Sequence, residues 1–247
     1  MKKCWACGHG PCGGGQSREH LISQGIFDQT KIFVQGFEWC AEKEVEVGLS
    51  AVASKILCRK HNSELSAVDS QGIVAIRALD GSAPALGSES QTLVNGEIFE
   101  RWLLKTAINV SYGSSLVLGV GMADSQPGIP PPYLLAVVFG GLAFSHRMGA
   151  YFLIPACDFK FRSGEITVIP IHKDGQIGGF YFHLRGVDLF LSLLPGSHPP
   201  TLRELGPTSL PQHILDAEPH YRSSSIITST NDGPPLQIRF SWPQQSR

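Results

Sequence analysis

Apolar residues recur at helical spacing over residues 96–110, in the middle of the chain. Six of them fall on one side of a helix: Ile98, Phe99, Trp102, Leu103, Ala107 and Val110. We therefore expect a helix there. A Pro-rich turn at residues 127–132 ends this region. The apolar runs that follow are shorter, which is typical of strands.

Strands are expected at residues 134–139, 151–154, 165–172, 180–184 and 236–242. Two of them flank Lys173-Asp174-Gly175-Gln176, and an Asp-Gly pair between such runs indicates a hairpin because glycine tolerates a positive φ. The last 53 residues hold nine of the 17 prolines, so we expect little regular structure there beyond the terminal strand. The pattern predicts an α+β fold in which a helix precedes a mainly antiparallel β region.

Residues 79–96 are rich in Ser, Gly and Ala without an apolar period, which is typical of a linker. They divide the 247 residues into an expected N-terminal unit, 1–78, and a C-terminal unit, 97–247. No motif indicates the role of the second unit, and substrate recognition, homo-oligomerisation and the sensing of a signal all remain open. Its histidines show no ligand spacing: His146, His172, His183, His198, His213 and His220.

The composition, 42% hydrophobic and 17% charged, is typical of a globular protein. The formal net charge is -1, so a phosphate-binding surface would have to be a local patch. The longest apolar run, residues 133–144, is shorter than the roughly 20 residues that cross a bilayer. No apolar signal core follows Met1-Lys2-Lys3. We expect a cytoplasmic protein with no membrane partner.

Two short pairs of metal-binding residue types stand out, a CxxC at Cys4 and a CxxH at Cys58. Two intervening residues let one tight turn direct both side chains at a single ion, and zinc takes four thiolate or imidazole ligands. His9 and Cys12 are alternative ligands, and ordinary unligated thiols are the simplest alternative of all. We expect a structural Zn²⁺ that links the two segments, held by Cys4, Cys7, Cys58 and His61.

Between the two pairs stands Glu19-His20-Leu21-Ile22, and Asn62 directly follows the second pair. A CxxC, then an acidic residue with His and two apolar residues, then Leu-Cys-x-x-His-Asn, resembles the HNH (His-Me finger) endonucleases. The resemblance is to the branch that carries a structural zinc, and it covers residues 4–72. It implies an N-terminal ββα-metal module and metal-dependent hydrolysis of phosphodiester bonds in nucleic acid, with DNA expected first.

The resemblance also implies roles for single residues. His20 would be the general base, since a neutral imidazole can take a proton from water. Glu19 and Asn62, also catalytic, would hold Mg²⁺ or Mn²⁺ through hard oxygen ligands, with Asn62 at the start of a helix. Asp69, two helical turns after Asn62, is a candidate to support these ligands. The candidates for phosphate contacts are Arg18, Arg59 and Lys60.

The chain departs from the family pattern in two places. His61 stands where cysteine is commoner, which zinc accepts. The family's middle Asn should fall near Ser54, and no Asn stands there. The aromatic residues Phe33, Phe37 and Trp39 would either stack on unpaired bases or form a local core. A second hypothesis is therefore a non-catalytic, zinc-containing module that binds nucleic acid or protein.

Overall fold

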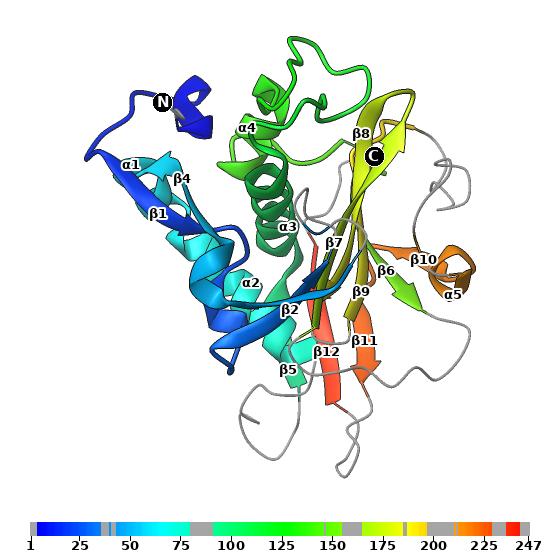
Figure 1. Ribbon diagram of the computed structural model, residues 1–247. Coiled ribbons are helices and arrows are strands. Elements are labelled where there is room, and N and C mark those ends of the chain that lie inside the picture. The colour runs from blue at the N-terminus through cyan, green and yellow to red at the C-terminus, as the bar shows by residue number, and fades with distance from the viewer. Residues whose placement is uncertain are drawn as a thin grey trace.

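The protein is a mixed α+β chain with mainly antiparallel sheets and few helices, as the sequence pattern predicted (Figure 1). The computed structural model describes residues 4–35, 40, 43–79, 91–145, 147–154, 165–184, 187–196, 210, 212–228 and 236–242. Among these residues the strands form three sheets. Four of the residues named above, Phe37, Trp39, His146 and His198, lie outside the described part of the chain.

The first sheet is a pair of antiparallel strands, β1 (Gln16–His20) and β4 (Ala53–Cys58). The 3-10 turn η1 (Trp5–Gly8) precedes β1, and helix α1 (Arg59–Glu64) begins directly after β4. The backbone N–H of Arg59 donates to the Gly15 carbonyl at 2.9 Å. Gly14 and Gly15 both have φ near +73°, which glycine adopts without strain. This turn folds the segment before β1 over the start of α1.

The second sheet has seven strands in the order β10-β6-β9-β8-β7-β2-β3. Strand β2 pairs with β7 in parallel, whereas the other neighbours are antiparallel. The predicted hairpin is confirmed, with Asp174 and Gly175 at positive φ between β7 and β8. The strands are β2 (Lys31–Gln35), β3 (Val45–Gly48), β6 (Gly149–Ile154), β7 (Glu165–Lys173), β8 (Gln176–Leu184), β9 (Val187–Ser192) and β10 (Glu218–Tyr221).

In the third sheet, β12 (Leu236–Ser241) lies between two other strands. It pairs in parallel with β5 (Gln91–Asn95) and antiparallel with β11 (Ser225–Thr228). The terminal strand predicted at residues 236–242 is thereby confirmed. The remaining short elements are η2 (Gln24–Ile26), η4 (Leu49–Val52) and α5 (Gln212–Leu215).

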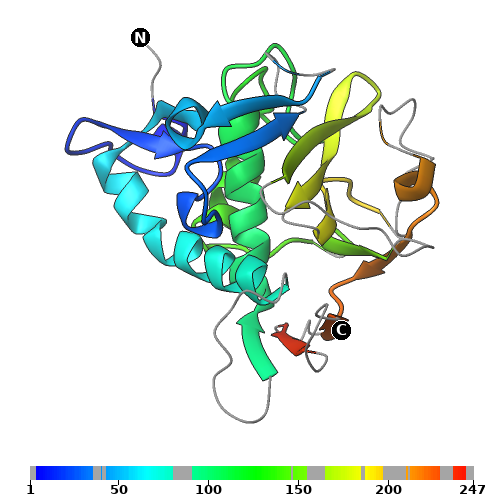
Figure 2. The same ribbon diagram turned by 60° about the horizontal axis from the view of Figure 1, so that its bottom comes forward.

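Helix α3 (Gly96–Ser111) runs through the centre of the molecule. The Asn95 side chain caps it by accepting from the Ile98 N–H at 3.1 Å. The helix lies between α2 (Ser66–Leu79) on one side and the seven-stranded sheet on the other (Figures 1 and 2). Because both flanks are covered, most of its residues are buried, charged ones included. The helix predicted over residues 96–110 is therefore confirmed.

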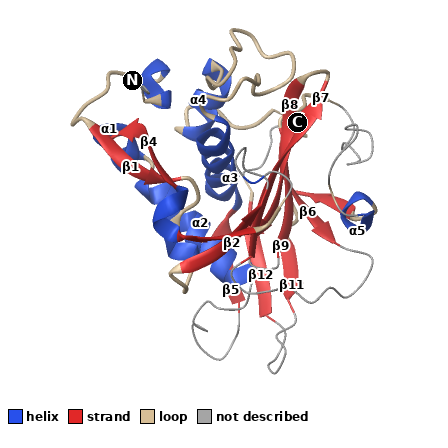
Figure 3. Ribbon diagram, viewed as in Figure 1, coloured by secondary structure: helices blue, strands red, loops and turns tan. Residues whose placement is uncertain are grey.

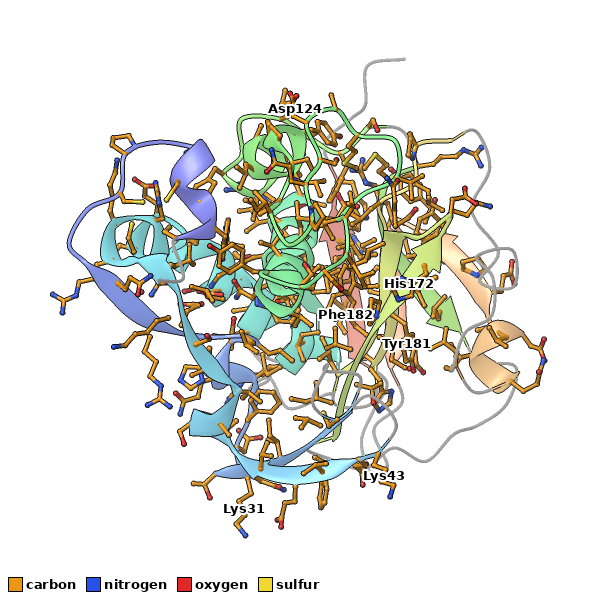
Figure 4. The ribbon with its side chains drawn as sticks, turned by 45° about the horizontal axis from the view of Figure 1, so that its top comes forward. Lys31, Lys43, Asp124, His172, Tyr181 and Phe182 are labelled. Atoms are coloured by element: carbon orange, nitrogen blue, oxygen red, sulfur yellow. The ribbon has the colours of Figure 1, made fainter. Side chains whose placement is uncertain are left out.

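One hydrophobic core is shared by segments from both halves of the chain, for example Ile22, Phe99 and Phe240. Figure 4 shows side chains filling the space between α3 and the sheet, with Lys31 and Lys43 at the outer edge. The division into units 1–78 and 97–247 stays a prediction. Whatever its outcome, the two parts pack against each other through apolar side chains.

Three predictions differ from the structure. The last 53 residues contain α5, β10 and β11 besides the expected terminal strand, and residues 91–95 of the expected linker form β5. The third difference concerns one predicted strand. A strand was expected at residues 134–139, but residues 134–138 belong to helix α4 (Pro132–Val138; Figure 3) and Phe139 is its C-cap. Pro132 begins the helix, where a fixed φ favours the first turn and the missing N–H costs nothing. Gly140, at φ +79°, follows its end. Short apolar runs fit a strand and a buried helix equally well, and the turn residues decided this case.

No helix in the described parts of the chain is both long and apolar enough to span a bilayer.

Candidate functional site

Four side chains meet where the segment before β1 crosses the start of α1. The Sγ atoms of Cys4 and Cys58 lie 3.3 and 3.4 Å from His61 Nδ1, and Cys12 Sγ lies 4.0 Å from it. All four ligand atoms lie within 4.8 Å of one another. Ligand atoms around a tetrahedral zinc stand about 3.5–3.8 Å apart. The cluster of Cys4, Cys12, Cys58 and His61, here called the Cys3His cluster, therefore suits one metal ion.

The cluster shares three of its four residues with the set expected from the sequence. Cys12 stands in it where Cys7 was expected, and Cys7 is exposed with its Sγ 3.0 Å from that of Cys12. The turn through Gly14 and Gly15 brings Cys12 back over α1, which the spacing of the cysteines does not reveal. His9, the other alternative, stacks on Phe139 at a centroid distance of 3.9 Å.

The surroundings of the cluster favour metal-binding protonation states at two of its residues. Burial acts to raise the pKa of Cys58, but backbone N–H groups of His61 and Gly13 bond to its sulfur and the pKa is lowered overall. Burial lowers the pKa of His61, which keeps its imidazole neutral. Burial raises the pKa of Cys4, and the hydrogen bond with Cys7 raises that of Cys12. Zinc binds thiolate and neutral imidazole, so binding would release protons from Cys4 and Cys12.

Glu19 and Asn62 lie side by side, although they are distant in sequence. Strand β1 places Glu19 directly opposite Ser54 of β4, and the Asn62 side chain hydrogen bonds with Glu19. The position of the missing middle Asn therefore faces Glu19. Asn62 does not begin its helix as expected, because α1 starts at Arg59 with Cys58 as its N-cap.

Helix α3 contributes a residue that the sequence analysis missed. Lys105 Nζ donates to Glu19 Oε1 and to Asp69 Oδ2, both at 2.6 Å, and its side chain is only 2% exposed. Burial raises the pKa of Glu19, whereas the charge of Lys105 and the hydrogen bond from Asn62 act to lower it. Asp69, named from its spacing, thus lies beside Glu19 and shares its counter-ion.

A chain of hydrogen bonds from Trp102 through Ser23 fixes the Asp69 carboxylate. Trp102 Nε1 donates to Ser23 Oγ at 2.8 Å, and Ser23 Oγ donates to Asp69 Oδ1 at 2.7 Å. Two turns further along α3 than Trp102, Asn109 accepts from Trp5 Nε1 at 3.0 Å and donates to the His20 carbonyl at 3.4 Å. The signal in the sequence is a lysine and an asparagine on the same buried helix stripe as Trp102, at spacings of three and four.

His20 ends β1 in a half-buried position. Its Nδ1 is buried and has no partner among the described residues. Burial lowers its pKa, and the positive charges of Arg18 and Lys105 act in the same direction, while a hydrogen bond with the Leu49 backbone opposes them. At neutral pH the imidazole is therefore neutral, the state in which it can accept a proton.

The three candidate phosphate contacts are all exposed. Arg18 on β1 donates from Nη2 to the Ser50 carbonyl at 2.7 Å. Lys60 on α1 donates to the Pro11 carbonyl at 3.2 Å and lies 3.9 Å from Glu64. Arg59 precedes Lys60 at the start of the same helix.

The residues expected to hold Mg²⁺ or Mn²⁺ fit such an ion only in part. Asn62 Oδ1 is buried without a partner among the described residues, so it suits a cation. Glu19 does not, because a buried ammonium already bonds to its Oε1. A carboxylate held this way is a poor ligand for a second cation. We therefore assign no chemical step to a divalent metal.

Comparison of the chain with protein-family models, with curated proteins and with solved structures found no match.

Proposed function

We propose that the chain is an endonuclease of the HNH type that hydrolyses phosphodiester bonds in nucleic acid, with DNA as the first substrate to test. The observation that carries the proposal is the placement of Glu19 and His20 at the end of β1, next to Asn62 in the helix that follows the paired strand β4. Two strands and a helix with these residues are what a ββα-metal module would need.

The proposed base is His20. Its lowered pKa supports this role, because hydrolysis needs an imidazole that is neutral before water attacks the phosphorus. His20 would take the proton of that water as the water oxygen bonds to phosphorus; the P–O bond to the leaving sugar oxygen breaks, and that oxygen takes a proton from solvent. The carbonyl of His20 accepts from Asn109, which helps to fix the end of the strand that carries the ring. Exposed Arg18, Arg59 and Lys60 are the side chains available for phosphate contacts.

The metal proposed for the Cys3His cluster is a structural Zn²⁺. Cys4, Cys12, Cys58 and His61 would hold it, and it would link the start of the chain to the junction of β4 and α1. All four positions are protein ligands, so the ion would leave no open position for substrate and would act on folding alone.

The test compares wild type with His20→Ala in cleavage of supercoiled plasmid and single-stranded DNA. Each assay is run with Mg²⁺, with Mn²⁺ and with no added divalent metal. We expect His20→Ala to lose at least about 100-fold in rate, the contribution of a general base. His172→Ala, which replaces an exposed histidine of β7, is the matched control and should cleave normally. Equal rates for wild type and His20→Ala would reject the assignment.

The Lys105–Glu19 ion pair favours a second candidate, a non-catalytic module that binds nucleic acid. Phosphate neutralisation dominates such binding, so the affinity would fall steeply with salt. DNA binding of this kind, with no cleavage in any of the three metal conditions, would replace the endonuclease proposal by this one.

A further inference from the structure

Lys105 and two carboxylates form a buried charge cluster that the proposed hydrolysis does not use. Glu19 is 6% exposed and the Lys105 side chain 2%, and the ammonium lies 2.6 Å from an oxygen of each of Glu19 and Asp69. A charge in such a position is stable only when paired. Glu19 and Asp69 thus share one cation, the Lys105 ammonium.

The ammonium is held in place by the helix that carries it. Lys105 belongs to the central, buried stretch of α3, where both neighbours, Leu104 and Thr106, are buried as well. The bonds from Trp102 to Ser23 and from Ser23 to Asp69 fix the far side of the cluster. Moving the ammonium aside would leave it unpaired in the core, which is strongly unfavourable.

A divalent cation bound to Glu19 would contact the same carboxylate as this ammonium. The two positive charges would repel each other in a site shielded from water, where screening is weak. Asn62 Oδ1 offers an amide oxygen close by, but an amide carries no charge to offset that repulsion. The arrangement lets one cation, not two, occupy the carboxylate pair.

We infer that the Lys105 ammonium is the resident cation of the Glu19–Asp69 pair and that it excludes Mg²⁺ and Mn²⁺ from Glu19. Lys105 is then a positioning residue: it neutralises and orients Glu19 beside His20 and, being buried, does not touch substrate. This inference rests on the proposed function for its meaning, but its test does not require cleavage. If both hold, DNA hydrolysis by this chain does not depend on a divalent metal bound to Glu19.

The experiment measures Mn²⁺ binding by electron paramagnetic resonance and calorimetry, with the zinc-loaded full chain so that the Cys3His cluster is occupied. Wild type is compared with Lys105→Met, with Glu19→Gln and with the double variant. Lys55→Met removes an exposed lysine of β4 and is the matched control. Zinc content and the thermal unfolding transition report whether each variant keeps its fold.

We expect no Glu19-dependent Mn²⁺ binding in wild type or in Lys55→Met. Glu19→Gln should therefore bind as much Mn²⁺ as wild type does. Lys105→Met, which frees both carboxylates, should gain Mn²⁺ affinity by at least about tenfold, and the double variant should lose that gain. Two results would overturn the inference: wild-type binding of one Mn²⁺ that Glu19→Gln removes, or no gain in a folded Lys105→Met.

If Lys105→Met does not fold, the comparison of wild type with Glu19→Gln alone decides. Glu19-dependent Mn²⁺ binding to wild type overturns the inference, and its absence supports it. Failure of the proposed function looks different, because a chain that cleaves no DNA in any condition leaves these binding results unchanged.

Discussion

The Sγ atoms of Cys7 and Cys12 lie 3.0 Å apart, yet only Cys12 belongs to the cluster with Cys4, Cys58 and His61. We therefore expect the two neighbouring thiols to contribute unequally to metal affinity. Cys12→Ser should lower zinc affinity by at least about tenfold, because it removes a ligand rather than a residue beside one. Cys7→Ser should change it less. The measurement is zinc content during titration with a competing chelator.

The two serine variants are matched controls for each other, since both replace an exposed thiol within one short segment. Wild type should hold one zinc per chain. A larger loss of zinc from Cys7→Ser than from Cys12→Ser would show that Cys7 is the fourth ligand, as the CxxC spacing first indicated.

At Gly72, α2 packs directly against the Trp102 side chain of α3. A Cβ atom at this position would overlap the Trp102 indole, which is itself fully buried and bonded to Ser23. Alanine normally favours a helix over glycine by roughly 0.5–1 kcal/mol. Here the overlap should reverse the sign, and Gly72→Ala should lower the free energy of unfolding by about 1–3 kcal/mol. Urea unfolding measures the difference. Gly141→Ala, at an exposed site with room for a Cβ, should have little effect.

Arg222 and Glu100 form a buried pair that links the residue directly after β10 to α3. The guanidinium donates to both carboxylate oxygens, at 2.9 and 2.8 Å, and the Ala150 N–H donates to the same carboxylate at 2.8 Å. Arg222→Met should destabilise the fold by about 3–5 kcal/mol at neutral pH, since it leaves a buried carboxylate without its cation.

The loss of folding stability caused by Arg222→Met should be smaller at acidic pH. Burial raises the pKa of Glu100, and without Arg222 nothing of comparable strength opposes that shift. A carboxyl whose folded pKa exceeds its unfolded pKa binds protons more strongly when folded, so the variant should gain stability relative to wild type as the pH falls. Glu100→Gln/Arg222→Met, which keeps an acceptor for the Ala150 N–H, should recover part of the loss. Urea unfolding at several pH values checks both statements.

The pH dependence of cleavage tests the assignment of His20. Burial, Arg18 and Lys105 lower its pKa below the ordinary value of about 6.5. A base acts when neutral, so the rate should rise with pH through a pKa below that value and be level at neutral pH. Arg18→Gln removes one of the positive charges and should move this rise to higher pH, whatever it does to the maximal rate. Lys55→Gln should leave it in place. A rise centred above the ordinary histidine pKa would contradict the assignment.

Much of the secondary structure could be predicted from local sequence patterns. The helix over residues 96–110 and the Asp174-Gly175 hairpin both follow from spacing and turn chemistry within one element. The run at residues 134–139 failed because its β-branched valines favour a strand while Pro132 and Gly140 set a helix. The parallel pairing of β2 with β7 could not be predicted, since it joins strands far apart in the chain.

In the candidate site, too, local spacing could be predicted from the sequence, whereas tertiary contacts could not. Cys58 and His61 lie one helical turn apart, so their spacing alone placed them together. Cys12 enters the cluster through a turn at positive φ, which is a tertiary arrangement. Lys105 reaches Glu19 only because α3 packs against β1 and α2, and a helical pattern shows which side is buried but not what it is buried against.

The parallel pairing of β2 with β7 also sets an order of events during synthesis. β2 ends at Gln35, but its partner ends only at Lys173, so most of the chain must leave the ribosome before that strand is enclosed. Lys105 is translated earlier and can meet Glu19 while the sheet is still incomplete. Until β7 arrives, the nascent chain offers an open strand edge on which another chain can add, so slow translation beyond α3 is the stage most exposed to misassembly.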